Sequence, residues 1–397
     1  MPKILLISAV FPPEPVVSAL LSSDLAAELT KRHDVVVLCP RPTRPHGFRF
    51  ENKFEPADYK VIRLNSYTCP QSDPLGRCRE SYSFGRQCYR YIIDNSKNID
   101  VIYANTWPLP AQYYTARAAR KFNIPFAIHI QDIYPESLFQ KLPFGSSLLN
   151  KFLLPFDKYV LKNANKIIAI SRKMNDYLVK TRTLDKEKIA TVFNWQDESD
   201  FTSQKMCKND NKQQPFTFMY LGNIGPVAGV DFLVAAFVKS GLGMCKLVIA
   251  GSGSMKSAVQ KQVRQYANCN IEFCDVPDGK VPEIQNRADV LLLPVKKGAT
   301  LSSVPSKLPA YMFSAKPVIA CVDNQSDTAD AIREADCGWI VAPDSVDDLA
   351  QMMRDVAGKN LDILCEKGRN GFDYAMLNYS KKENLPQILK IIENAVA

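Results

Sequence analysis

The chain has 397 residues, of which 46% are hydrophobic and 23% are charged, and its formal net charge is +9. This composition excludes a disordered or collagen-like chain, and the length suits two domains better than one core. The cations are spread along the sequence, which indicates either a solvated basic surface or an anionic partner. Because no helix-turn-helix, zinc-finger or aromatic RNP pattern occurs, we expect a membrane face or an anionic ligand as partner, and no nucleic acid.

The eleven cysteines are irregularly spaced and contain no CxxC pair, so no metal or redox site is expected. Cys39, Cys245 and Cys321 lie in or beside apolar runs and are predicted to be buried thiols of a reducing cytosol. The first apolar segment, 4–10, has the length of a strand and lacks a signal-peptide cleavage site. No apolar run approaches the roughly 18 residues of a membrane-spanning helix. We therefore expect a cytoplasmic protein that is soluble or peripheral to a membrane.

Strand-like and helix-like segments alternate in the first half of the chain. Apolar runs predict strands at 4–10, 35–39, 61–64, 101–104, 126–130, 166–170 and 189–193. Helical spacing predicts helices at 18–29, 82–95, 111–122, 148–163 and 173–181. Repeated βαβ units indicate a parallel sheet with helices on both faces.

A polar, lysine-rich segment interrupts this alternation, which then restarts. We predict an N-terminal Rossmann-like domain at 1–200, a linker at 201–215 and a second Rossmann-like domain at 216–378. The C-terminal helix, 379–397, is expected to pack back on the first domain. Strands of the second domain are predicted at 216–221, 246–250, 271–273, 290–293, 317–321 and 338–341. Its helices are predicted at 232–240, 255–266, 281–287, 308–314, 327–335, 346–357 and 365–376. The expected fold is α/β, with two tandem doubly wound domains that face one another across a cleft.

Glycine-rich loops follow two strands of the second domain. Gly222, Asn223 and Gly225 stand between a strand and a helix, where glycines allow close backbone approach and a helix start favours a diphosphate. The alternative is an ordinary tight turn. Gly251 and Gly253 supply only two glycines of a dinucleotide fingerprint, so NAD is not expected.

A second candidate loop joins the strands predicted at 290–293 and 317–321. It combines three lysines with hydroxyl side chains, at Lys296, Lys297, Ser303, Ser306 and Lys307. Because this loop ends on a helix start, backbone N–H groups and the helix dipole would add to the positive charge of the lysines. We predict a binding site for a phosphorylated ligand, in which these residues and the glycine-rich loops bind the sugar nucleotide.

Polar residues also follow strands of the first domain. His129 and Asp132 end one strand and could do acid/base work or orient a hydroxyl group, although a structural histidine is the alternative. Glu136 follows one turn later at the same edge. Pro13, Glu14 and Ser18 come after the first strand, and together with Glu136 they are predicted to lie on the acceptor side.

The segment 138–166 interleaves leucine, phenylalanine and lysine. Such a basic amphipathic helix can lie on an anionic membrane surface. The alternative is a helix that faces the core and exposes a solvated basic side.

Motifs from both halves of the chain resemble the retaining glycosyltransferases of family four, which have the GT-B fold. In the first half they are FPP at 11–13, HIQD at 129–132, ISR at 170–172 and FNW at 193–195. In the second half they are YLGNIG at 220–225, LVIAGSG at 247–253, ADVLLLP at 288–294, VPSKL at 304–308, KPVIA at 316–320 and CGW at 337–339. The HIQD, PSK and FNW elements are most similar to the branch that builds bacterial O-antigen and capsule repeats, such as the WbuB-type N-acetyl-L-fucosamine transferases.

The resemblance implies a nucleotide-sugar donor, usually a UDP-sugar, with no cofactor and no metal. It also implies transfer with retention, in which the donor phosphate accepts the proton of the acceptor. The acceptor implied is an oligosaccharide on a polyprenyl diphosphate at the inner face of the cytoplasmic membrane, and the chain would be peripheral on that anionic surface. His129 and Asp132 would lie near the transferred sugar.

The chain departs from the family pattern at three places. Val16 and Val17 replace the two glycines of the family's first loop. Asn223 and Ala228 replace the Arg and Lys of the first loop in domain two. Ser302 and Ala310 replace the two glutamates of the Glu-x7-Glu pair. Lys296, Lys297 and Lys307 could supply the missing positive charge. Two alternatives remain: a UDP-sugar 2-epimerase on the same fold, and a non-catalytic paralogue.

Overall fold

The computed structural model describes residues 1–44, 56, 58–69, 73–105, 109–139, 146–201, 215–266, 269–277, 279–297 and 307–396. The chain forms two compact units, Met1–Asn194 with Asn384–Ala397, and Trp195–Glu383. Of the segment predicted as a linker, only Phe201 and Pro215 lie within the described residues. None of the helices in the described ranges is long and apolar enough to cross a membrane.

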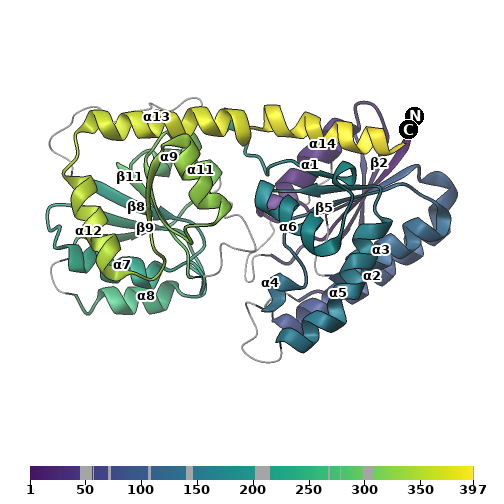
Figure 1. Cartoon of the computed structure of the whole chain (residues 1–397), viewed down its shortest axis with the longest axis horizontal. Coiled ribbons are helices and arrows are strands. Elements are labelled where there is room, and N and C mark those ends of the chain that lie inside the picture. The colour runs from purple at the N-terminus through teal and green to yellow at the C-terminus, as the bar shows by residue number, and fades with distance from the viewer. Residues whose placement is uncertain are drawn as a thin grey trace. The chain divides into compact units, whose positions relative to one another are not determined.

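A seven-stranded parallel sheet forms the centre of the first unit (Figure 1), in the order β3-β2-β1-β4-β5-β6-β7. Its strands are β1 (Lys3–Ser8), β2 (Asp34–Pro40), β3 (Lys60–Leu64), β4 (Val101–Asn105), β5 (Phe126–Ile130), β6 (Lys166–Ala169) and β7 (Ile189–Thr191). Leu5 of β1 stands opposite Val36 of β2 on one side and Ile102 of β4 on the other. The strand order reverses between β1 and β4, which makes the carboxyl ends of these strands the switch point where such sheets bind ligands.

The helices of this unit are α1 (Val17–Leu29), α2 (Pro74–Asn95), α3 (Leu109–Phe122), α4 (Glu136–Phe139), α5 (Ser146–Asn163), α6 (Arg172–Arg182) and the C-terminal part of α14 (Lys381–Val396). Helices α2, α3 and α5 pack side by side (Figure 1). Helix α14 is held near the end of α1 by a 3.2 Å contact between His33 Nε2 and Glu393 Oε1. Helix α2 begins earlier than predicted because Asp73 caps it and accepts a hydrogen bond from Gly76 N at 2.7 Å.

The second unit repeats this design with a six-stranded parallel sheet in the order β10-β9-β8-β11-β12-β13. Its strands are β8 (Thr217–Leu221), β9 (Lys246–Ala250), β10 (Ile271–Cys274), β11 (Val290–Pro294), β12 (Val318–Cys321) and β13 (Gly338–Val341). Its helices are α7 (Val230–Ser240), α8 (Lys256–Val263), α9 (Val281–Gln285), α10 (Lys307–Phe313), α11 (Asp327–Ala335), α12 (Val346–Ala357) and α13 (Leu361–Asn378). The prediction of two parallel-sheet, Rossmann-like domains is confirmed. The switch point of this unit lies between β8 and β11.

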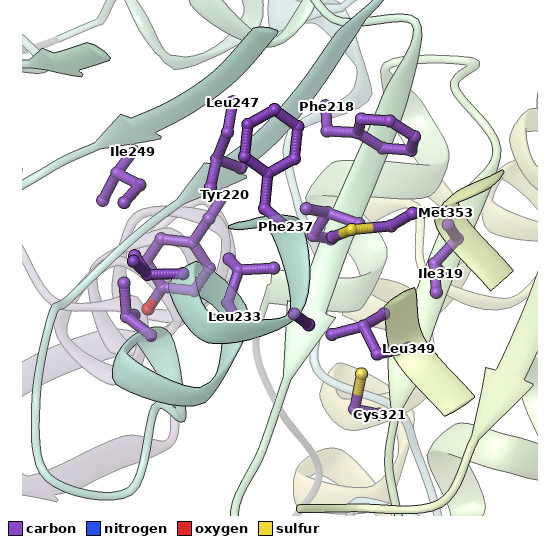
Figure 2. Packing of buried hydrophobic residues seen from close by; sticks show 14 of the residues in the cluster. Phe218, Tyr220, Leu233, Phe237, Leu247, Ile249, Ile319, Cys321, Leu349 and Met353 are labelled. Atoms are coloured by element: carbon purple, nitrogen blue, oxygen red, sulfur yellow. The ribbon is translucent and has the colours of Figure 1, made fainter. Parts of the chain in front are cut away.

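An apolar core fixes β8 at the centre of the second unit (Figure 2). Phe218 and Tyr220 of β8 pack with Leu233 and Phe237 of α7 and with Met353 of α12. Burial of each such side chain contributes roughly 1.5–3 kcal/mol to folding. The Tyr220 ring is completely buried in this core, so the ring is a rigid support for whatever its hydroxyl group touches. The predicted thiols of Cys39, Cys245 and Cys321 are likewise free and buried.

Candidate active site

Three loops of the second unit are joined by backbone hydrogen bonds at the switch point. The loop after β8 meets the loop after β9, since Gly222 N donates to Ala250 O at 3.0 Å and Ile224 N donates to Ser252 O at 2.7 Å. The loop after β11 joins them through Lys296 N, which donates to Val227 O at 3.1 Å. The structure therefore brings the glycine-rich loops together with Lys296 and Lys307, the two ends of the lysine loop that the sequence predicted as part of the same site.

Glycine is required at two positions of this loop cluster. Gly222 has φ +150° and Gly251 has φ +128°, both in the region that favours glycine. A Cβ on Gly222 would overlap the side chain of Lys307, and a Cβ on Gly251 would overlap the carbonyl oxygen of Gly222. The glycines thus let one loop lie directly on the next, and they leave room for Lys307.

Replacing Gly251 by alanine is expected to cost about 2–4 kcal/mol of unfolding free energy, because the new methyl group meets backbone that cannot move aside. Urea denaturation of the whole chain measures this loss. Gly243→Ala is the matched control in the same unit, since a Cβ there meets nothing within 4 Å. Equal stability of the two variants would contradict the close packing of the loops.

Lys307, the first residue of α10, is the main charged group of the cluster. Its Nζ donates to Tyr220 Oη at 2.7 Å and lies 4.7 Å from the centre of the Tyr220 ring. Tyr220 Oη in turn donates to Asn223 O at 2.6 Å. Burial lowers the pKa of Lys307 to about 8. Within the described ranges no carboxylate pairs with Lys307, so its ammonium group keeps donors for an anionic ligand.

The other predicted cations are arranged differently. Lys296 Nζ lies 3.4 Å from Asp231 Oδ2, so part of its charge is balanced within the protein. The Lys297 side chain is exposed, and its backbone N donates to Asp344 Oδ2 at 3.3 Å. Asn223 and Gly253 are exposed on the loops after β8 and β9, while Gly225 is buried. The predicted residues Ser303 and Ser306 lie outside the described residues, and so does Ser302, which replaces a family glutamate. Ala310, which replaces the other glutamate, lies in α10.

In the first unit, His129 belongs to a buried hydrogen-bonded chain. His129 on β5 is 1% exposed, and burial lowers its pKa to about 3, so the ring is neutral. Its Nδ1 lies 2.7 Å from Tyr103 Oη, and its Nε2 lies 3.2 Å from Gln131 Nε2. Asn194 Nδ2 donates to Gln131 Oε1 at 2.7 Å, which orients the Gln131 amide so that its nitrogen faces the histidine. Asn194 Oδ1 is buried and has no hydrogen-bond partner among the described residues.

The loop after β1 places Glu14 and Pro13 at the carboxyl edge of the sheet, with Ser18 in the first turn of α1. Glu14 is 2% exposed, and burial raises its pKa to about 7. Its Oε2 accepts from Phe11 N at 3.2 Å, and its Oε1 accepts from Thr43 N and Arg44 N at 2.9 Å. Glu14 therefore ties the loop after β1 to the loop after β2.

Glu136 is held in a buried ion-pair network. Arg182 Nη2 donates to Glu136 Oε2 at 2.7 Å, and Arg182 Nε donates to Asp157 Oδ2 at 2.7 Å. Tyr177 Oη donates to Glu136 Oε1 at 2.8 Å. Both oxygens of Glu136 are thus used to join α4, α5 and α6, which is a structural arrangement. Asp132, by contrast, is partly exposed just after β5.

Three residues of these sites were not selected from the sequence. Tyr220 supports Lys307, and Gln131 and Asn194 extend the chain of hydrogen bonds from His129. Each lies inside a motif that the sequence did offer, namely YLGNIG, HIQD and FNW. The motifs therefore indicated where these residues lie in the sequence. They did not indicate which residue of each motif contacts Lys307 or His129.

Two doubly wound units, with a lysine-bearing loop cluster at the switch point of the second, define an α/β protein of the GT-B type. Residues 22–195 match the glycosyl transferase 4-like domain, and residues 215–358 match the glycosyl transferases group 1. The chain therefore belongs to the glycosyltransferases.

Known proteins share this design along most of the chain. WbjE of Pseudomonas aeruginosa, described as a probable glycosyltransferase, is 22% identical over 286 residues, which are 67% of this chain and 68% of WbjE. The structure of HepE from Anabaena in complex with UDP and glucose has a TM-score of 0.69 at 15% identity and covers 99% of this chain and 100% of its own. The structure of WaaG, a glycosyltransferase involved in lipopolysaccharide biosynthesis, has a TM-score of 0.69 at 14% identity and covers 98% of this chain and 99% of its own.

Proposed function

We propose that the chain transfers a sugar from a UDP-linked donor to a lipid-linked oligosaccharide, with retention, during assembly of a bacterial surface polysaccharide such as O-antigen or capsule. The donor part of this proposal is supported mainly by Lys307, a partly buried cation that lies against the glycine loops of the second unit. The UDP bound in HepE and the pathway of WaaG support a sugar nucleotide and a surface glycan. The likeness of the motifs to the WbuB-type branch favours an N-acetylated or deoxy sugar.

In the proposed reaction, the bond between the sugar C1 and the diphosphate breaks, and UDP leaves as an anion. Lys307 and the N–H groups of the glycine loops stabilise the charge that develops on the leaving diphosphate. The acceptor hydroxyl forms the new bond to C1, and its proton passes to an oxygen of the departing phosphate. Positive charge from lysine gives the leaving group the assistance it needs, so we propose a reaction that uses no metal.

We assign the first unit to the acceptor and the transferred sugar. Asp132, which is partly exposed, is the polar group proposed to contact sugar hydroxyls, and Asn194 holds the Gln131 amide in place. His129 is too buried to reach a substrate directly, so in this proposal it positions Gln131. The membrane location follows from the lipid of the acceptor, which lies in the inner leaflet of the cytoplasmic membrane.

Binding of UDP is expected to weaken as the pH rises through about 8. The lowered pKa of Lys307 means that its ammonium is charged below about pH 8 and neutral above it. An anionic diphosphate should therefore lose up to about tenfold in affinity for each further pH unit. Calorimetric titration with UDP on both sides of that pH measures the effect. Lys307→Arg, which stays charged, should show no such decline, and a flat profile in the natural protein would contradict the assignment.

The function is tested by supplying a panel of UDP-sugars together with polyprenyl-diphosphate-linked oligosaccharides. Extension of the lipid-linked acceptor, with release of UDP, is the expected result. An epimerase would instead convert UDP-N-acetylglucosamine alone to its 2-epimer. A non-catalytic paralogue would bind UDP without turnover across the whole panel, and either of these outcomes would replace the proposal.

A further inference from the structure

Helices α2, α3 and α5 of the first unit (Figure 1) surround a groove lined entirely by apolar and aromatic side chains, with a volume of about 230 Å³. Its lining includes Tyr82, Tyr113, Tyr114, Phe152, Leu153 and Phe156. The side chains come from three helices that are distant in sequence. The groove is therefore a feature of the fold and not of one amphipathic segment.

The rings of this groove form a continuous row. From Tyr82 to Tyr114, Tyr113, Phe156 and Phe152, successive ring centres are 5.7, 6.0, 5.3 and 5.7 Å apart. The row is also open to solvent, since Phe152 is 65% exposed and Tyr82 is 46% exposed. A row of exposed rings that combines phenylalanine with tyrosine, whose hydroxyl remains hydrated, suits the boundary between hydrocarbon and water.

The exposed charged side chains of these three helices are almost all positive. Among the described side chains of these three helices, the exposed cations are Arg79, Arg86, Arg90, Arg117, Arg120, Lys121, Lys151, Lys158 and Lys162, and the exposed carboxylate is Asp94. Arg86 lies at the aromatic row itself, 5.8 Å from the Tyr82 ring. Arg117 and Arg120 lie 5.9 and 5.8 Å from the rings of Tyr89 and Tyr159, which are the next rings beside the row, 6.0 Å from Tyr114 and 5.2 Å from Tyr113.

The acidic residues of these helices do not offset that charge. Glu80 is buried and pairs with Arg77 at 2.7 Å. Asp157 is buried and pairs with Arg182. Both carboxylates are thus already neutralised inside the unit. The groove and the exposed cations of its three helices, which we call the α2-α3-α5 face, combine an apolar surface with an excess of positive charge.

We propose that the α2-α3-α5 face docks on an anionic lipid bilayer, with lipid hydrocarbon in the aromatic groove and the arginines at the headgroups. A second copy of the chain is a poorer fit, because it would bring the same cations against these cations. Aromatic burial and attraction to anionic headgroups act together in interfacial binding. This inference rests on the proposed function in one respect: docking would place the protein on the membrane that carries the proposed lipid-linked acceptor.

The test is sedimentation of the full chain with vesicles of phosphatidylcholine alone or mixed with phosphatidylglycerol. The natural protein is expected to bind the mixed vesicles and to be released by salt. Phe152→Ser and Arg86→Glu should each lower the partition coefficient about tenfold. Leu377→Ser, at a side chain that is 75% exposed in the second unit, and Lys261→Glu, at an exposed lysine of α8, are the matched controls and should bind as the natural protein does.

Natural protein that stays in the supernatant with anionic vesicles at low salt would overturn the proposal, as would unchanged binding by Phe152→Ser and Arg86→Glu. A natural dimer that Phe152→Ser converts to a monomer would assign the face to self-association instead. Preference for a single-stranded RNA over vesicles would assign it to nucleic acid. Titration with UDP is measured on the same samples. For the natural protein, absent vesicle binding with intact UDP binding counts against this inference alone, and absent UDP binding with intact vesicle binding counts against the proposed donor alone.

Discussion

Replacing Lys307 by alanine is expected to weaken UDP binding by about 10–100-fold and to lower kcat by roughly a further 100-fold. The first loss follows from the removal of a charged hydrogen bond to the diphosphate. The second follows because the charge on the leaving group grows in the transition state, where a partly buried cation stabilises it most. Calorimetry with UDP and a transfer assay at saturating donor separate the two effects.

Lys297→Ala is the control for this variant, since it removes an exposed lysine at the same edge of the sheet. Its UDP affinity should change no more than about twofold, because an exposed charge is screened by solvent. A Lys307→Ala protein with the affinity and kcat of the natural chain would remove Lys307 from the site. A strong loss in Lys297→Ala instead would move the phosphate contact to the exposed lysine.

Replacing Arg182 by methionine is expected to destabilise the first unit by about 3–5 kcal/mol, the usual penalty when one partner of a buried ion pair is removed. The variant leaves Asp157 and Glu136 without the guanidinium group that holds them. Burial already raises the pKa of Asp157 to about 6. Without the arginine the pKa rises further, so the penalty should shrink as the pH falls and the buried acid becomes neutral.

Urea denaturation at pH values above and below that pKa measures the effect. Lys180→Ala, at an exposed position of the same helix, is the matched control and should change stability by less than about 0.5 kcal/mol. An Arg182→Met protein as stable as this control would mean that the network does not hold the unit together. A penalty that does not depend on pH would show that the unpaired carboxylates are not its cause.

The elements of the fold were largely readable from the sequence, because fully buried parallel strands are short apolar runs. The runs at 101–104 and 290–293 each became a central strand, β4 and β11. The start of α2 was missed, because its first turns carry arginines and no apolar spacing, and the cap at Asp73 is a local signal that spacing alone ignores. The parallel direction of the strands came from the general rules for βαβ units and not from particular residues, and the order of the strands was not predicted.

The candidate site was predictable as a set of loops and not as a set of contacts. The glycine loops and the lysine loop were identified because strand ends gather at one sheet edge. That Lys307, and not Lys296, keeps donors for a ligand depends on Tyr220 and Asp231, which are distant in sequence from both lysines. In the same way, the role of Glu136 depends on Arg182, and no sequence spacing connects them.

The first βα loop occurs at the same topological position in both units, and its two versions have opposite chemistry. In the second unit it is built from glycines whose close packing leaves room for an ammonium group. In the first unit it is built from prolines, and the Glu14 carboxylate already accepts hydrogen bonds from Phe11, Thr43 and Arg44. The protein's own carboxylate thus occupies the backbone donors to which an external anion would bind. We therefore expect a phosphate to bind at the second unit's version of this loop, and the ligand of the first unit to be recognised through its hydroxyl groups and not through charge.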